Sequence, residues 1–145
     1  QLLEETKGVE FYQIGQQRHC NSQDHYNWCT ERGVKTLFAD TILDLGQPPE
    51  VAILQFLEPV LLKRRNVFIS LDIDVFASHE APGCSQSWPW GIPSLALKRV
   101  FDILYTRWDV KGLGIYEVAP KLDYGLQTSR LAALFAHQYL THYGV

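Results

Sequence analysis

The 145-residue sequence has few cysteines and no methionine. The three cysteines, Cys20, Cys29 and Cys84, are too few for a disulfide-stabilised scaffold, and no short cysteine or histidine spacing around them predicts a zinc site. Because an unpaired cysteine usually behaves as a small apolar side chain, we expect reduced thiols in a cytoplasmic protein. The chain begins with glutamine and not methionine, and the sequence of residues 1–5 is typical of the middle of a helix. We therefore expect that the chain does not begin where its gene begins.

The sequence also lacks long apolar runs and an excess of basic residues. No run approaches the roughly 18–20 apolar residues of a membrane-spanning helix, so we expect no membrane partner. Lysine and arginine total 13 against 16 acidic residues, and the net charge of −3 argues against a nucleic-acid partner. With 46% hydrophobic and 20% charged residues, the composition is that of a folded globular domain.

Segments typical of strands alternate along the chain with segments typical of helices. We expect strands at residues 9–14, 34–39, 67–71 and 110–118, and helices at residues 23–32, 50–64, 94–107 and 126–143. This alternation predicts an α/β fold of about four βα units, with a parallel sheet and right-handed crossovers. In such sheets, ligands bind beyond the carboxyl ends of the strands.

Individual residues sharpen these expectations. Ser22 is a suitable N-cap for the first helix, and Gly33 is a suitable stop for it. The near-continuous apolar run at residues 67–71 is typical of a parallel strand that is buried on both faces. Helical spacing places Val51 and Leu134 on the buried faces of their helices.

Two aspartates follow the most apolar strand. Residues two apart in a strand point to the same face, about 6.5–7 Å apart, so Asp72 and Asp74 would repel each other there. A divalent cation relieves this repulsion, and carboxylate oxygens suit Mg²⁺ or Mn²⁺. The alternative interpretation is that one aspartate caps a loop while the other is solvated.

Two enzyme classes that use Asp-x-Asp in this position fit the sequence less well. Phosphatases of the haloacid dehalogenase type usually continue with a Gly-Thr turn and a later acidic pair, whereas Val75 and Phe76 follow here and no later strand ends in an acidic pair. A phosphatase stays as a minor alternative, with Asp72 as its nucleophile. Nucleotide-sugar glycosyltransferases hold Mn²⁺ with Asp-x-Asp, but no other part of the sequence supports a sugar-nucleotide site.

Two further motifs identify a third class. The first runs from Ser70-Leu71-Asp72-Ile73-Asp74 to Ala81-Pro82-Gly83, and the second runs from Glu117-Val118-Ala119-Pro120 through Asp123 to Thr128-Ser129-Arg130-Leu131-Ala132. In this order and spacing they resemble the signature of the ureohydrolases, the family of arginases, agmatinases and formimidoylglutamases. Pro82-Gly83-Cys84-Ser85 and the loop at residues 14–22 are most similar to formimidoylglutamases, while residues 86–90 depart from the usual pattern.

The resemblance implies a particular fold and extent. We expect the arginase-like fold, a three-layer αβα arrangement with a parallel sheet. The family's other metal ligands lie in Gly-Gly-x-His and Asp-Ala-His-x-Asp segments, and neither segment occurs in this sequence. Residues 1–145 would therefore form the C-terminal part of a single ureohydrolase domain, without its N-terminal half. We expect this part alone to be inactive and to bind metal weakly.

The resemblance also implies residue roles. In the family, two Mn²⁺ ions share a bridging hydroxide that attacks the substrate carbon. Asp72 would bridge both ions, Asp74 would hold one, and Glu117 would be catalytic, accepting hydrogen bonds from the substrate's cationic N–H groups. Arg18 and Asn21 are candidates for binding a substrate carboxylate, although a loop arginine is more often simply solvated.

The predicted reaction is Mn²⁺-dependent hydrolysis of N-formimino-L-glutamate to L-glutamate and formamide, a step of histidine degradation. An arginase-like or agmatinase-like activity is the alternative within the family, and a truncated non-catalytic domain is the alternative outside it. Besides its small-molecule substrate, we expect a second copy or the missing N-terminal half as partner. His79, Trp88 and Trp90 lie in the loop after the aspartates, where the tryptophans either line the substrate pocket or pack the loop.

Overall fold

The computed structural model of the chain describes Glu5 and residues 8–143. The helix-like segment expected at residues 1–5 lies, apart from Glu5, outside this part. The strands are β1 (Tyr12–Gln16), β2 (Lys35–Phe38), β3 (Asn66–Asp72) and β4 (Asp109–Tyr116). The α-helices are α2 (Gln23–Glu31), α3 (Ala39–Asp44), α4 (Pro49–Leu61), α5 (Ser94–Arg107) and α6 (Gln127–His142), and the short 3₁₀ turns are η1 (Arg18–Cys20), η2 (Ile73–Val75) and η3 (Tyr124–Leu126). The expected α/β alternation is confirmed, with α3 as an addition.

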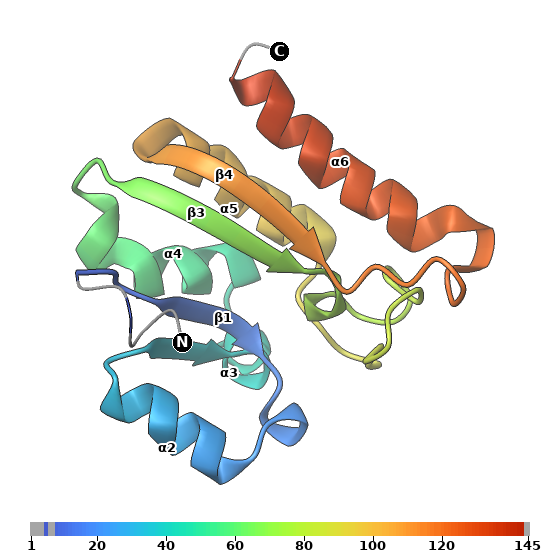
Figure 1. Cartoon of the computed structure of the whole chain (residues 1–145), viewed down its shortest axis with the longest axis horizontal. Helices are drawn as coiled ribbons and strands as arrows, with labels where there is room; N and C mark the ends of the chain where they lie inside the picture. Colours follow the sequence, from blue (N-terminus) through green and yellow to red (C-terminus); the bar gives the residue numbers. More distant parts are fainter. Residues whose placement is uncertain (1–4, 6–7, 144–145) are drawn as a thin grey trace.

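The four strands form two parallel pairs. Within the described residues, β1 pairs with β2 and β3 pairs with β4, and no hydrogen-bonded ladder joins the two pairs (Figure 1). The expected parallel arrangement of the strands is therefore confirmed, and in this part of the chain it consists of two separate pairs. Residue patterns predict strands, but the choice of neighbouring strand depends on contacts between distant segments.

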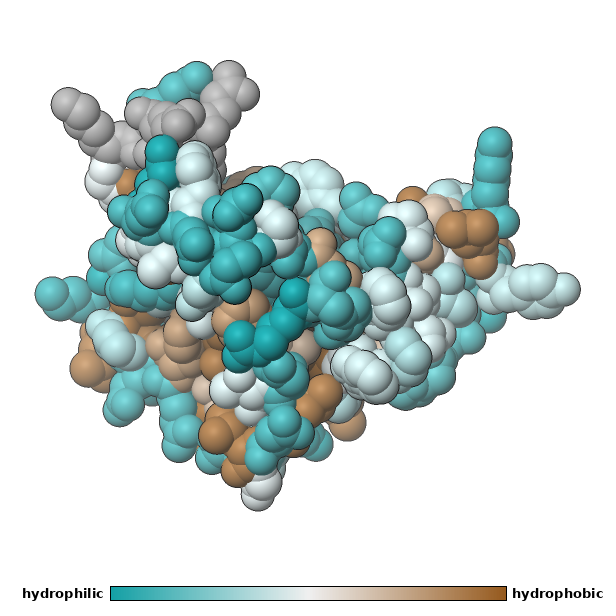
Figure 2. Space-filling model, turned by 90° about the horizontal axis from the view of Figure 1, so that it is seen from below, coloured by the Kyte–Doolittle hydropathy of each residue, from teal (hydrophilic) through white to brown (hydrophobic). Residues whose placement is uncertain are grey.

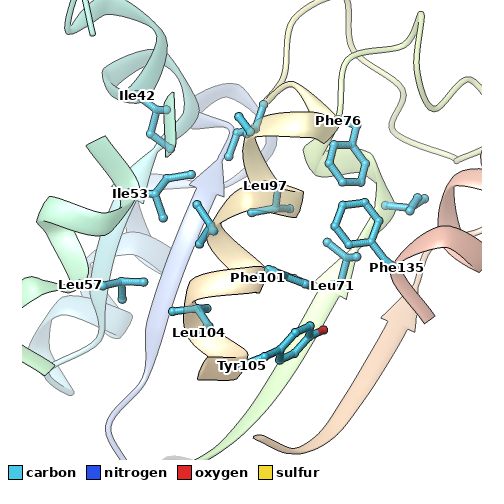
Figure 3. Close-up of a cluster of buried hydrophobic side chains, with 14 of the residues drawn as sticks. Ile42, Ile53, Leu57, Leu71, Phe76, Leu97, Phe101, Leu104, Tyr105 and Phe135 are labelled. Atoms are coloured by element: carbon cyan, nitrogen blue, oxygen red, sulfur yellow. The ribbon is translucent and has the colours of Figure 1, made fainter. Parts of the chain in front are cut away.

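The pairs are held in one body by an apolar core that lies mainly between helices and β3. Figure 3 shows side chains from α4, α5, α6 and β3 converging in this cluster. Phe135 of α6 stacks on Phe76 at 5.4 Å between ring centroids and meets Phe101 of α5 edge-on at 5.3 Å. Each fully buried large side chain of this kind contributes about 1.5–3 kcal/mol relative to exposure. The core thus fixes α6 against α5, beside the end of β3.

The ends of α2 follow the sequence signals, whereas α4 ends at Leu61 and not at the predicted residue 64, and two predicted buried positions are wrong. Ser22 caps α2 by accepting a hydrogen bond from the His25 amide at 3.3 Å, and Gly33 has a φ of +75° just after the helix. Val51 is 37% exposed and Leu134 is 66% exposed. In α4 the apolar residues outnumber the buried positions, so periodicity alone did not distinguish the face that contacts α5.

Strand β3 is buried on one face only, which corrects the expectation for residues 67–71. Val67 and Ile69 pack against the core and Leu71 is 4% exposed, whereas Phe68 on the opposite face is 62% exposed. In Figure 1, α5 lies behind β3 and β4, and no helix of the described residues crosses in front of them. Phe68 and Tyr116 are therefore open to solvent on this face, with Tyr116 47% exposed.

None of the described helices is both long enough and apolar enough to cross a membrane. Viewed from below, the surface shows apolar side chains emerging in patches between hydrophilic ones (Figure 2).

Candidate metal and substrate site

Three carboxylates lie at the carboxyl ends of β3 and β4. Asp72 is the last residue of β3 and is paired in register with Tyr116, so Glu117 directly follows the neighbouring strand position. Asp74 lies in the 3₁₀ turn η2. The strand spacing expected for the two aspartates is therefore wrong, because β3 ends at Asp72 and the chain turns immediately after it.

The negative charges of these three side chains influence one another. Burial raises the pKa of Asp72, and the Glu117 carboxylate raises it further. Burial also raises the pKa of Asp74, with additional contributions from the negative charges of Asp72 and Glu117. The ion pairs found within residues 8–143 include none of the three carboxylates. Their mutual repulsion is thus not balanced by a side-chain cation in the described part of the chain.

Glu117 has an unusual backbone conformation and one polar side-chain neighbour. Its φ of +64° lies in the left-handed region, which costs a non-glycine residue roughly 1–2 kcal/mol. The Ser85 hydroxyl donates a hydrogen bond to Glu117 Oε2 at 3.1 Å. Ser85 belongs to the motif that suggested the family, but its contact with Glu117 depends on a long-range approach that no local pattern reveals.

The carboxylate oxygens are ligands of the type that a hard divalent cation binds, but they are too few to complete its coordination. Carboxylate oxygens are the ligands that Mn²⁺ and Mg²⁺ prefer, and a cation would relieve the repulsion between Asp72 and Asp74. However, the described residues contain no cluster of three or more histidine, cysteine, aspartate or glutamate side chains arranged to hold a metal ion. The carboxylates of the described residues therefore do not by themselves form a complete metal site.

The loop between η2 and α5 folds back over the strand ends. The Ser78 amide donates to the Trp88 carbonyl at 2.7 Å and the Ile92 amide donates to the Val75 carbonyl at 2.9 Å, which closes the loop on itself. Burial raises the pKa of the Cys84 thiol, and the charges of Asp74 and Glu117 act in the same direction. This loop therefore brings its central residues, 83–85, to the carboxylates.

The remaining candidates of this loop lie around its rim. The His79 side chain is exposed, and its carbonyl accepts a hydrogen bond from Gln127. Trp88 is half-buried and packs edge-on against His19 at 4.2 Å between ring centroids, whereas Trp90 is 58% exposed. Trp88 thus packs the loop against η1.

Arg18 and Asn21 lie after β1, in and just beyond η1. Two contacts tie this segment to the loop described above: the His19–Trp88 ring contact and a 3.0 Å hydrogen bond from Gln17 Nε2 to the Trp90 carbonyl. Arg18 and Asn21 line a cavity of about 140 Å³. The Arg18 guanidinium forms an ion pair with Asp40 at 2.7 Å and lies 3.7 Å from the centre of the Phe38 ring. The Arg18 guanidinium is therefore already in contact with side chains of β2 and α3.

The model of the arginase family matches residues 2–141. The chain belongs to the arginase family. Its parallel strands and its helices are those of an arginase-like α/β fold, as expected from the sequence.

Individual relatives of this arginase-family chain agree with that assignment. Formimidoylglutamase from Bacillus subtilis (strain 168) is 33% identical over 134 residues, which cover 91% of this chain and 41% of the relative. The crystal structure of a B. subtilis formimidoylglutamase superimposes with a TM-score of 0.83 at 31% identity, over 97% of this chain and 44% of that one. A Trypanosoma cruzi formiminoglutamase solved with Mn²⁺ has a TM-score of 0.81 at 19% identity, over 99% of this chain and 48% of that one, and thus shares the fold. The chain spans less than half the length of the curated relatives it matches.

Proposed function

We propose that this arginase-family chain forms part of a Mn²⁺-dependent hydrolase of linear amidines, which converts N-formimino-L-glutamate to L-glutamate and formamide in histidine degradation. The observation that carries the proposal is the convergence of Asp72, Asp74 and Glu117 at the ends of two parallel strands, without a balancing side-chain cation among the described residues. Similarity to formimidoylglutamases over nearly the whole chain supports the choice of substrate.

In the proposed reaction, a water oxygen adds to the amidine carbon and the bond between that carbon and the glutamate nitrogen breaks. The departing nitrogen takes a proton and becomes the amino group of glutamate, while the remaining fragment leaves as formamide. Asp72 and Asp74 would hold Mn²⁺ together with further ligands. When bound, Mn²⁺ lowers the pKa of a coordinated water and so supplies a nucleophile near neutral pH.

Glu117 would act on the substrate itself. Its carboxylate is held by Ser85 and faces the aspartates, so it can accept hydrogen bonds from the cationic N–H groups of the amidine. Such charge-assisted hydrogen bonds are roughly twice as strong as neutral ones. Glu117 thus orients the amidine carbon toward the aspartates.

Arg18 and Asn21 would bind a carboxylate of the substrate at the other side of the site. The contacts of Gln17 and His19 with the loop before α5 support this assignment, because they fix the η1 segment beside that loop. The Arg18 guanidinium would then interact with both Asp40 and the substrate carboxylate. Because of this competition, Arg18 would bind the substrate less strongly than a free arginine would.

We further propose that residues 1–145 correspond to the C-terminal part of a single domain and are inactive alone. The incomplete donor set and the coverage of 41–42% of the curated relatives support this view. Calorimetric titration of the 145-residue chain with Mn²⁺ tests it. We expect weak binding, and two tight sites on this chain would contradict the proposal.

The chain would associate with the N-terminal half of such a domain or with a second copy of itself. The unjoined strand pairs and the exposed Phe68 and Tyr116 support this proposal, because free strand edges and apolar faces favour association. Size-exclusion chromatography with light scattering should show a species larger than 16.6 kDa, and a stable monomer would count against it. The three free cysteines fit a reducing compartment, and we propose a cytoplasmic location.

The decisive experiment assays the full-length product of the gene with Mn²⁺ against formiminoglutamate, arginine and agmatine. We expect formamide release from formiminoglutamate, and loss of at least about 100-fold in kcat/KM for Glu117→Gln, because the neutral amide removes a charged hydrogen bond in the transition state. Hydrolysis of arginine or agmatine alone would instead indicate an arginase-like or agmatinase-like activity. No hydrolysis of any of the three would favour a non-catalytic role.

A further inference from the structure

Asp123 and Thr128 form a buried hydrogen-bonded unit next to the proposed site, yet among the described residues neither side chain forms a hydrogen bond or ion pair with the three carboxylates. Asp123 is 9% exposed and Thr128 is fully buried. Polar groups buried to this extent are costly unless they are hydrogen-bonded, so their partners indicate what the unit does.

Asp123 fixes the start of α6. Its Oδ1 accepts from the Thr128 amide at 2.8 Å, and its Oδ2 accepts from the Ser129 amide at 2.8 Å and the Ser129 hydroxyl at 2.6 Å. The residue directly before the helix, Leu126, has a φ of +59° and makes no capping hydrogen bond with its side chain. Asp123 therefore supplies the cap that the usual position lacks.

The capped helix start in turn holds the loop before α5. The Gly83 amide donates to Thr128 Oγ1 at 2.7 Å. A Cβ on residue 83 would lie 2.5 Å from Cβ of Asp123, so the absence of a side chain on Gly83 allows this approach. Thr128 thus connects the helix start to the centre of the loop.

Two sets of contacts connect the segment around Gly83 to Glu117 and its neighbours. Its carbonyl accepts from the Ala119 amide at 2.8 Å, two residues after Glu117. Ser85, two residues after Gly83, donates to the Glu117 carboxylate. Both sets of contacts hold the segment around Glu117, whose left-handed backbone conformation persists only when the surrounding structure stabilises it.

We infer that Asp123 and Thr128 are positioning residues, which place the Glu117 carboxylate for substrate binding by fixing Gly83 against the start of α6. This inference rests on the proposed role of Glu117. From these contacts we expect that removal of the Thr128 hydroxyl increases the mobility of Gly83, Ala119 and Glu117 together, although Thr128 itself touches no substrate.

The test compares three variants of the full-length gene product. Thr128→Val keeps the shape and removes the acceptor for Gly83, whereas Thr128→Ser keeps a hydroxyl. Gln127→Ala is the matched control, because Gln127 bonds the carbonyls of His79 and Glu80 in the same loop from the adjacent position of α6.

For Thr128→Val we expect faster amide hydrogen exchange at Gly83 and Ala119, a displaced carboxyl ¹³C signal of Glu117, and a KM for formiminoglutamate raised about tenfold, the effect of one hydrogen bond to a charged group. Thr128→Ser and Gln127→Ala should stay within about twofold of the wild-type KM. A merely structural role would lower the active fraction, and therefore kcat, while leaving KM unchanged.

An unchanged Glu117 signal in Thr128→Val, an unchanged KM, or an equal effect in Gln127→Ala would overturn the inference. If the wild-type protein hydrolyses no amidine, the proposed function fails. The exchange and ¹³C measurements still decide whether the Thr128 hydroxyl positions Glu117, so the two failures are distinguishable.

Discussion

Replacement of Asp74 by asparagine tests the carboxylate cluster through stability, independently of catalysis. The pKa of Asp74 in the folded chain is raised by burial and by the charges of Asp72 and Glu117. A carboxyl whose folded pKa lies above its unfolded value of about 3.9 stabilises the fold only below that unfolded pKa, and this contribution is lost as pH rises through the folded pKa. At neutral pH the ionised Asp74 therefore destabilises the metal-free chain.

The size of the effect follows from Coulomb's law. Two unit charges about 4 Å apart repel by about 1 kcal/mol in water and about 4 kcal/mol at an effective dielectric constant of 20, and this energy falls as the charges move apart. Because the site is partly solvated, we expect Asp74→Asn to stabilise the metal-free chain by about 1 kcal/mol at pH 7. For a domain of this size, this change corresponds to a rise in Tm of about 2–4 °C.

Thermal and urea unfolding of the metal-free chain at pH 7 and pH 3 provide the assay. The difference between Asp74→Asn and wild type should disappear at pH 3, where the aspartate is protonated in both states. Asp44→Asn, at the exposed end of α3, is the control and should change the unfolding free energy by less than about 0.5 kcal/mol at either pH. A destabilising Asp74→Asn at pH 7, or a gain that persists at pH 3, would refute the electrostatic reasoning.

Three further predictions concern the core, the strand ends and Glu117. Phe135→Ala removes a ring that is 2% exposed and should destabilise the chain by about 3–5 kcal/mol in urea unfolding, whereas Leu134→Ala, at an exposed neighbour, should cost far less. Gly15→Ala should destabilise by more than about 1 kcal/mol, because φ is +83° and the new Cβ would lie 2.5 Å from Val75 Cγ2; a neutral result would mean that β1 does not contact η2 there. Ser85→Ala should lower kcat/KM for formiminoglutamate by about 3–10-fold, and unchanged kinetics would show that the Ser85 hydroxyl does not support Glu117.

Local sequence signals mark the ends of α2, but they do not reveal which apolar positions are covered in the folded chain. Ser22 and Gly33 mark the ends of α2 because caps and left-handed stops depend on residues only a few positions apart. Leu134 and Phe68 were expected to be buried because both lie in apolar patterns, and both are exposed. Whether an apolar position is covered depends on which distant segment packs against it, and a local pattern does not contain that information.

The candidate site shows the same division. Asp72 and Glu117 stand out in the sequence because Asp72 directly follows one apolar strand-forming run, Glu117 lies near the end of another, and both belong to recognisable motifs. Their facing arrangement, however, depends on the parallel pairing of β3 with β4, in which Asp72 lies beside Tyr116. The contact of Ser85 with Glu117 spans 32 positions and that of Gly83 with Thr128 spans 45, so both appear only in the folded chain.

Local backbone preferences and side-chain chemistry were sufficient to predict the α/β order of elements, the ends of α2 and the carboxylates available for a cation. The tertiary structure decided that the strands form two separate parallel pairs, that β3 is covered on one face, and that Asp123 and Thr128 hold the segment around Glu117. These outcomes arise from packing and hydrogen bonds between residues far apart in the chain, whose partners are chosen only when the whole core assembles.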